Sequence, residues 1–197
     1  MKLNKDQIDV LTEIFNIGVG RAANALNELV DKKVHLEIPD INVITTNEAN
    51  DEMKRFSDKK LSVIEHDFSC SFSGTASLAF PEGDAAKLVS FLTGEDVGGL
   101  DLDSVKSGTL TEVGNILINS LLGSISNILD EKMDFTLPLY REVFSKDLII
   151  NELEIDRLTI ICKTKFTIEE LEIDGIFFMY ISSEAIEMLL AQLIGVE

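Results

Sequence analysis

The stretch Leu11-Thr-Glu-Ile-Phe-Asn-Ile17 returns 99 positions later as Leu110-Thr-Glu-Val-Gly-Asn-Ile116. Each copy is followed by a proline, Pro39 or Pro138, which stands 23 positions after the asparagine of its copy. An internal repeat has to be recognised first, because its period and copy number decide the architecture. Two copies predict two pseudo-equivalent halves, each with a Glu/Asn pair on one long helix.

The length of the chain fits one domain that contains this repeat. Its 197 residues suffice for one sizeable core that two halves share. We therefore predict a single domain over residues 1–197, with a first half over 1–97 and a second half over 98–197. Gly98-Gly99 lies near the midpoint and is the predicted junction.

Hydrophobic periodicity and turn residues predict the same order of elements in both halves. Asn4, with Gln7 three residues later, marks the start of the first long helix as a capping pair. The predicted first half is a helix over 5–30, a strand over 34–38 that stops at Pro39, a strand pair over 61–70 and 72–80, and a helix from Pro81 to Leu92 closed by Gly94. The predicted second half is a helix ending at Leu129, a short strand leading to Pro138, a strand pair over 158–166 and 173–181, and a helix over 184–194.

Two features of the second half differ from the first. Its long helix starts either at Asp103 or, after Gly108, at Thr109 with Glu112 as a capping box. The apolar stretch Leu148–Ile155 has no counterpart in the first half. Paired antiparallel strands with helices to one side are typical of the α+β class, which is the fold class that we predict.

Charge and composition exclude several classes of function. A net charge of −18 argues against binding to nucleic acid or to an anionic membrane surface, and suits solubility or a partner with a basic patch. There is no run of 18 apolar residues to span a membrane, and the polar N-terminus lacks a signal segment. We therefore expect a cytoplasmic protein with no membrane partner.

The cysteines and histidines show no metal-binding spacing. Cys70 and Cys162 lie in strand-like apolar stretches and are expected to be small buried hydrophobes in a reducing compartment. His35 and His66 are 31 residues apart, which matches no common ligand pattern. We expect this chain to bind no metal and no cofactor.

One stripe of the first helix carries Asp9, Glu13 and Asn16, at positions i, i+4 and i+7. Glu112 and Asn115 are the corresponding pair in the second copy. A Glu/Asn pair on an exposed helix is most simply a solvated face. Asparagine is a mediocre helix former, however, so its recurrence inside a helix at the same offset from a glutamate favours a functional pair.

The chemistry of such a pair suits the placement of water. A carboxamide has no titratable proton near neutral pH, but its oxygen accepts a hydrogen bond from water and its nitrogen donates one. This suits in-line attack on a phosphoryl group, where catalysis is mostly positioning and where a carboxylate would repel the phosphoryl oxygens. The glutamate would then pair with a Lys or Arg of a partner that also carries the phosphate.

The pattern Asp/Ser-x3-Glu-x2-Asn-x22-Pro resembles the signature of the CheC-like chemotaxis phosphatases. It runs from Asp9 to Pro39 and, with glycine in its first position, from Gly108 to Pro138. The family includes CheC, CheX and the phosphatase domain of FliY. Two copies within 197 residues resemble the two-site layout of CheC.

The resemblance implies a CheC-like fold and hydrolysis of the aspartyl phosphate on a phosphorylated CheY-like response regulator. By position, the water-orienting amides are Asn16 and Asn115, and the partners of the regulator's lysine are Glu13 and Glu112. Asp9 is expected to contact the docked regulator. The regulator, rather than this chain, is expected to carry Mg²⁺.

The resemblance also assigns a role to the prolines, and the residues around the two motifs predict unequal sites. Pro39 and Pro138 are expected to support the connection from helix to strand without doing chemistry. The first site is expected to be the more active one, because Gly108 lacks the side chain that Asp9 supplies, and because a cap at Thr109 would occupy Glu112.

Two other functions remain open for a protein of this family. One is a non-catalytic chemotaxis adaptor that acts through a partner such as the deamidase CheD. The other is a flagellar-switch-related binding protein, similar to the middle domain of FliM. The complete Glu/Asn signature, present twice, favours the phosphatase over the switch component.

Overall fold

The structure is a computed structural model that describes residues 3–30, 33–45, 47–49, 51, 59–94, 102–148, 157–168 and 171–194. The helices are α1 (Lys5–Val30), α3 (Glu82–Thr93), α4 (Leu102–Leu129), the short 3-10 helix η1 (Ser145–Asp147) and α5 (Ser183–Ile194). The strands are β1 (Val34–Thr45), β2 (Lys60–Ser69), β3 (Ser73–Pro81), β4 (Asp134–Phe135), β5 (Leu139–Phe144), β6 (Arg157–Ile168) and β7 (Leu171–Ser182). Both predicted strand pairs and both shorter helices are confirmed.

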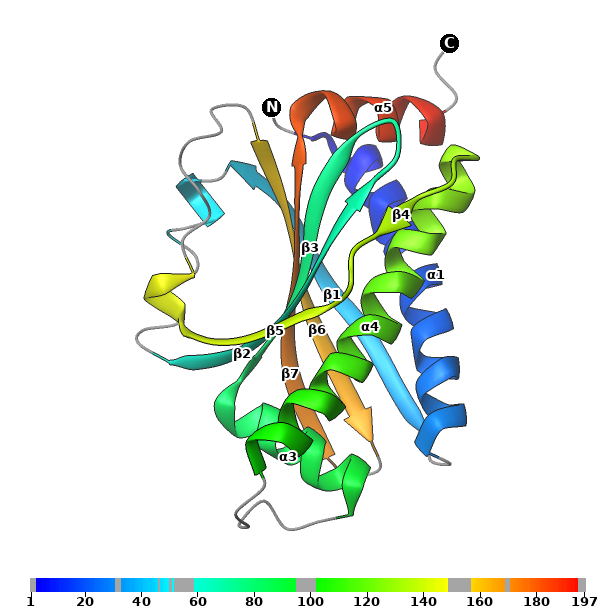
Figure 1. The fold of residues 1–197 in the computed structure, drawn as a ribbon. Coiled ribbons are helices and arrows are strands. Elements are labelled where there is room, and N and C mark those ends of the chain that lie inside the picture. Colours follow the sequence, from blue (N-terminus) through cyan, green and yellow to red (C-terminus); the bar gives the residue numbers. More distant parts are fainter. Residues whose placement is uncertain are drawn as a thin grey trace.

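The described strands form one seven-stranded antiparallel sheet. The order is β1-β6-β7-β3-β2-β4, and β5 pairs with β2 beside β4. Exchanging β1 with the β4–β5 segment, β2 with β6, and β3 with β7 leaves this order unchanged. The C-terminal strands β6 and β7 therefore lie between β1 and β3, two strands from the N-terminal part of the chain (Figure 1), and the α+β class is confirmed. The division into repeated halves stays a prediction.

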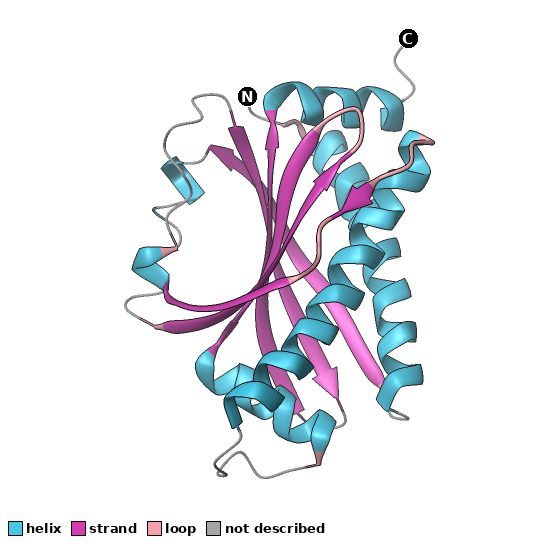
Figure 2. Ribbon diagram, viewed as in Figure 1, coloured by secondary structure: helices cyan, strands magenta, loops and turns pink. Residues whose placement is uncertain are grey.

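The two long helices lie side by side against one face of this sheet, while α3 and α5 lie at its opposite ends (Figure 2). Two glycines set the distances in this layer. A Cβ on Gly18 would lie 2.8 Å from the Cα of Leu121, so the backbones of α1 and α4 approach each other there. A Cβ on Gly114 would lie 2.6 Å from the Ile64 side chain, which seats α4 directly on β2.

The main core fills the space between this helix layer and the sheet. Phe15 of α1 is buried there and meets Phe177 of β7 edge to face, with ring centroids 5.8 Å apart. From α4, Leu117 and Leu121 are buried in the same cluster. Each such side chain stabilises the fold by about 1.5–3 kcal/mol. The polar stripes of α1 and α4 are therefore turned away from the sheet.

β1 is longer than predicted, because Pro39 does not end it. The strand runs to Thr45, and its pairing with β6 shifts register between Glu37 and Asp40. Proline lacks the N–H that a sheet ladder uses, so it is tolerated at edge strands and bulges. β1 is an edge strand, which meets that condition.

Two sequence predictions fall wholly or mostly outside the described residues. These are the junction Gly98-Gly99 and the apolar stretch Leu148–Ile155, of which only Leu148 is described. Leu148 is buried in a smaller cluster with Val63 and Phe178, apart from the main core. Among the described helices, none has both the length and the apolar character that crossing a membrane requires.

Candidate active sites on helices α1 and α4

The first Glu/Asn pair stands on the solvent side of α1. Asp9, Glu13 and Asn16 are all exposed, while Leu11 and Phe15 between them are buried in the core. The alternation follows from the 3.6-residue period of an amphipathic helix. The stripe that the sequence predicts to be exposed is therefore exposed in this copy.

The predicted capping pair fixes the start of this helix. The backbone N–H of Gln7 donates to Asn4 Oδ1, and that of Asn4 donates to Gln7 Oε1, both at 2.9 Å. Reciprocal bonds of this kind satisfy two backbone donors that a helix start leaves unpaired. Asp9 and Glu13 follow within the next two turns, so the site is held by a well-defined helix.

An open, partly apolar surface surrounds Asn16. Ile17, the next residue, keeps 44% of its surface exposed. Gly20, one turn further, is exposed, and a Cβ added there would meet no atom within 4 Å. An exposed isoleucine beside a polar pair suits contact with a macromolecule, because such contact buries apolar area.

The second pair has a different environment. Glu112 is exposed, but Asn115 is only half-exposed. Its Oδ1 accepts a hydrogen bond of 2.8 Å from Nδ2 of Asn119, one turn further along α4. The Oδ1 of Asn119 is buried and has no hydrogen-bond partner in the described part of the chain. The amide of the second site is thus bonded inside its own helix.

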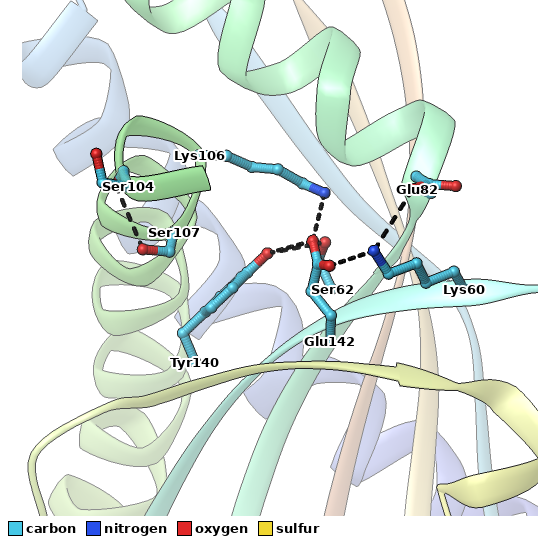
Figure 3. A network of polar contacts seen from close by, with 8 residues as sticks. All are labelled: Lys60, Ser62, Glu82, Ser104, Lys106, Ser107, Tyr140 and Glu142. Atoms are coloured by element: carbon cyan, nitrogen blue, oxygen red, sulfur yellow. Dashed lines mark hydrogen bonds and ion pairs between the residues drawn. The ribbon is translucent and has the colours of Figure 1, made fainter. Parts of the chain in front are cut away.

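A cluster of polar side chains anchors the first turns of α4 (Figure 3). Lys106 of α4 donates to Glu142 Oε1 of β5 at 2.6 Å, and the Tyr140 hydroxyl donates to the same oxygen at 3.0 Å. Lys60 of β2 pairs with the other carboxylate oxygen. The bonds from Lys106 and Lys60 lower the pKa of Glu142 to about 2, while burial raises the pKa of Tyr140 to about 12.

This cluster excludes the late helix start at Thr109. α4 begins at Leu102, and its Lys106 is already tied to the sheet before Gly108 is reached. Gly108 is therefore an interior position of the helix rather than its boundary. Thr109 lies two turns inside, so the predicted capping box with Glu112 is wrong, and Glu112 is exposed.

The two prolines lie at interruptions of strand pairing. Pro39 lies within the register shift of β1, and Pro138 lies between β4 and β5, which pair with separate parts of β2. Neither stands in the connection that directly follows its helix, and their supporting role stays a prediction. The two positions correspond under the exchange of strands described above.

Each site stands alone on its own helix. Within the described ranges, no hydrogen bond or ion pair links the pair Glu13 and Asn16 to the pair Glu112 and Asn115. The described residues of the chain include no group of three or more His, Cys, Asp or Glu side chains placed to hold a metal ion. Asn119 and the Glu142 cluster are the elements of the second site that sequence reasoning missed.

Among the relatives that match this chain by sequence are two phosphatases of Bacillus subtilis. No family model matches the chain. The flagellar motor switch phosphatase FliY of Bacillus subtilis is 28% identical over 138 residues, which are 69% of this chain and 35% of FliY. The CheY-P phosphatase CheC of the same organism is 27% identical over 129 residues, 64% of this chain and 61% of CheC. The chain thus covers less than two thirds of either relative.

Solved structures share the fold at lower identity. FliY of Thermotoga maritima superposes with a TM-score of 0.78 at 18% identity, and the match covers 100% of both chains. The FliM middle domain from H. pylori gives 0.61 at 14% identity, over 96% of this chain and 99% of that one. CheX, in a CheX–CheY–BeF3–Mg²⁺ complex from Borrelia burgdorferi, gives 0.54 at 18% identity, over 87% and 97%. The chain is thus similar to CheC- and FliY-like proteins in sequence and to FliY and CheX in fold.

Proposed function

We propose that this chain hydrolyses the aspartyl phosphate of a phosphorylated CheY-like response regulator. The observation that carries the proposal is the exposed pair Glu13 and Asn16 on the outer face of α1, whose spacing recurs at Glu112 and Asn115. The relative named as a CheY-P phosphatase supports the reaction, and the CheX–CheY complex supports the kind of partner.

In the proposed reaction, this chain contributes placement rather than a nucleophile. The Oδ1 of Asn16 accepts a hydrogen bond from a water and aims it at the phosphorus, opposite the bond to the regulator's aspartate. The water oxygen bonds to phosphorus while the bond to the aspartyl oxygen breaks. The aspartate leaves as a carboxylate, and the protons of the water pass to inorganic phosphate and solvent. A neutral amide suits this place because it does not repel the phosphoryl oxygens.

Glu13 has a different role in the proposal. Its carboxylate forms an ion pair with a lysine of the regulator beside the acyl phosphate, which fixes the register of the two proteins. Asp9, one turn earlier on the same stripe, extends the acidic edge toward the partner. Glu112 and Asn115 take the same roles in the second copy. Mg²⁺ is proposed to reach the reaction on the regulator.

The test is the lifetime of the phosphorylated regulator with and without this chain. We expect the chain to accelerate phosphate release in Mg²⁺, and the acceleration to disappear when the metal is chelated. Calorimetry of the isolated chain with Mg²⁺ should show no tight binding. Hydrolysis at the uncatalysed rate would refute the proposal, and full acceleration without metal would refute its Mg²⁺ step.

The fold likeness to the FliM middle domain favours one alternative, a flagellar-switch-related binding protein. A protein of that kind, or an adaptor that acts through CheD, binds its partner without shortening the lifetime of the phosphate. The same assay, run beside a binding measurement with the regulator, separates these functions. The repeated Glu/Asn pair is our reason for placing the phosphatase first.

A further inference from the structure

The repeat places different residues one turn after each candidate water-orienting asparagine. Asn119 follows Asn115, and Gly20 occupies the corresponding position after Asn16. Asn119 Nδ2 donates to Asn115 Oδ1 at 2.8 Å, whereas glycine at position 20 offers no side chain. An internal bond to the asparagine amide is therefore built into the second copy and absent from the first.

The direction of this hydrogen bond follows from which atom of Asn119 can be buried without a partner at the lower cost. As it stands, Asn119 leaves one buried oxygen without a partner. Turning both amides over would keep a bond between them but would bury the NH₂ group of Asn119 unpaired instead. Orphaned buried N–H donors are rarer in proteins than under-satisfied carbonyl oxygens. The observed direction is the favoured one, and it commits the oxygen of Asn115 to Asn119.

That oxygen is the atom which the proposed mechanism needs. To orient a water on the docked regulator, Asn115 has to turn its Oδ1 outward and give up the bond from Asn119. The amide of Asn119 is then left unpaired at both ends, and its oxygen is buried, which is unfavourable. Asn16 carries no such cost, because it is exposed beside Gly20.

We infer that Asn119 is a positioning residue that holds Asn115 in an internally bonded state and makes the second site the slower of the two. The inference rests on the proposed phosphatase function. It replaces the predicted reason for unequal sites, the cap at Thr109, with a side-chain contact that the structure contains. Asn119 touches neither regulator nor phosphate and acts only through Asn115.

The test uses variants in which one site works at a time. In the Asn16→Ala background only the second site remains, and Asn119→Leu then removes the donor while keeping a similar volume. We expect kcat to rise about three- to tenfold, the range that one internal hydrogen bond carries, with KM unchanged. Asn119→Ala is the second variant for the same measurement, should the leucine fail to fold.

The reciprocal change uses the first site. In the Asn115→Ala background, Gly20→Asn introduces the missing amide, and the open space at this position accommodates its Cβ. We expect kcat to fall by about the same three- to tenfold factor. Gly20→Ala adds the Cβ without the amide, and its kcat should fall less than that of Gly20→Asn.

A measurement without catalysis tests the contact itself. The side-chain amide protons of Asn119 should exchange slowly with solvent in the parent chain, and faster in Asn115→Ala, because their acceptor is gone. Fast exchange in the parent chain would contradict the hydrogen bond from Asn119 to Asn115.

The outcomes separate the inference from the function on which it rests. If the parent chain hydrolyses no aspartyl phosphate, the proposed function fails and the inference fails with it. If the parent chain is active, but neither Asn119→Leu nor Asn119→Ala raises kcat in the Asn16→Ala background, the inference alone is overturned.

Discussion

Asn16 and Asn115 differ more in their surroundings than in their sequence context. Asn16 is exposed beside Gly20, whereas Asn115 is half-buried and accepts a hydrogen bond from Asn119. An amide that orients a water needs a free acceptor oxygen. The residue one turn after each asparagine therefore decides whether that oxygen is available. The carboxylates Glu13 and Glu112, in contrast, are exposed in both copies.

His66, which is 1% exposed, makes the folding stability depend on pH. Its Nδ1 lies 3.1 Å from the carbonyl oxygen of Thr136, and its Nε2 is buried without a partner among the described residues. Burial lowers the pKa of His66 below its usual 6.5. The unfolded chain therefore binds a proton more readily than the folded chain, and folding stability falls as the pH drops below 6.5.

We predict that the free energy of unfolding of the parent chain decreases between pH 7 and pH 5, and that His66→Gln removes this decrease. Urea titrations at a series of pH values provide the measurement. His35→Gln is the control, because His35 is exposed, and among the described residues it pairs with Glu37. A parent chain with the same stability at both pH values would show that His66 does not titrate in this way.

At the scale of elements, the two motif helices sit differently on the sheet. Phe15 of α1 corresponds in the repeat to Gly114 of α4. The phenylalanine fills the space between α1 and the sheet, whereas the glycine lets α4 contact Ile64 of β2 directly. The helix that carries the second site is therefore the more tightly seated of the two.

A pair of alanine substitutions on α4 tests this seating. Gly114→Ala places a Cβ 2.6 Å from the Ile64 side chain and should destabilise the fold by about 1–3 kcal/mol. Gly123→Ala meets no atom within 4 Å and should be neutral, or stabilising by up to about 1 kcal/mol, since alanine is the better helix former. Equal unfolding midpoints for the two variants would mean that α4 does not rest on β2 as described.

The Glu142 cluster tests how the start of α4 is held. Glu142→Gln leaves Lys106, whose side chain is 12% exposed, without its carboxylate, so amide exchange in the first turns of α4 should become faster. Glu82→Gln is the control, because Glu82 is exposed and lies 3.8 Å from Lys60.

The pH dependence of this cluster has a defined sign. The pKa of Glu142 is about 2, below its usual 4.5, so its stabilising effect is present above pH 4.5 and is lost as the pH falls through 2. The stability difference between the parent chain and Glu142→Gln should therefore persist at pH 4. A difference that vanishes at that pH would contradict the assignment.

Local patterns predicted most of the elements but not all of their boundaries. Helical periodicity, the Asn4 and Gln7 pair and Gly94 gave correct ends, since each acts through neighbouring residues. The strand end predicted at Pro39 and the alternative helix start at Thr109 were wrong, because contacts with residues distant in sequence set these boundaries. Pro39 is accommodated by a shift in pairing with β6, and the earlier helix start is held by Glu142 of β5.

At the scale of the whole molecule, the 99-residue offset carries most of what the sequence reveals. It predicted two equivalent helices with polar pairs, and the strand order is unchanged when the corresponding strands are exchanged. The contact between Asn115 and Asn119 could not be predicted in the same way. Residue 119 and its counterpart Gly20 are visible in the sequence, but which atoms of an amide face each other depends on burial in the folded chain.

The most direct test of the account is the dephosphorylation rate of a phosphorylated CheY-like regulator with the double variant Asn16→Ala/Asn115→Ala. We predict that the variant loses about 100-fold or more in rate, because water placement is lost. It should remain folded, at a cost of about 1 kcal/mol from the acceptor that Asn119 loses. The matched control is Asn24→Ala/Asn127→Ala, which changes exposed asparagines of the same two helices outside the motifs and should keep the parent rate. Hydrolysis by a folded Asn16→Ala/Asn115→Ala variant at the parent rate would contradict the central claim.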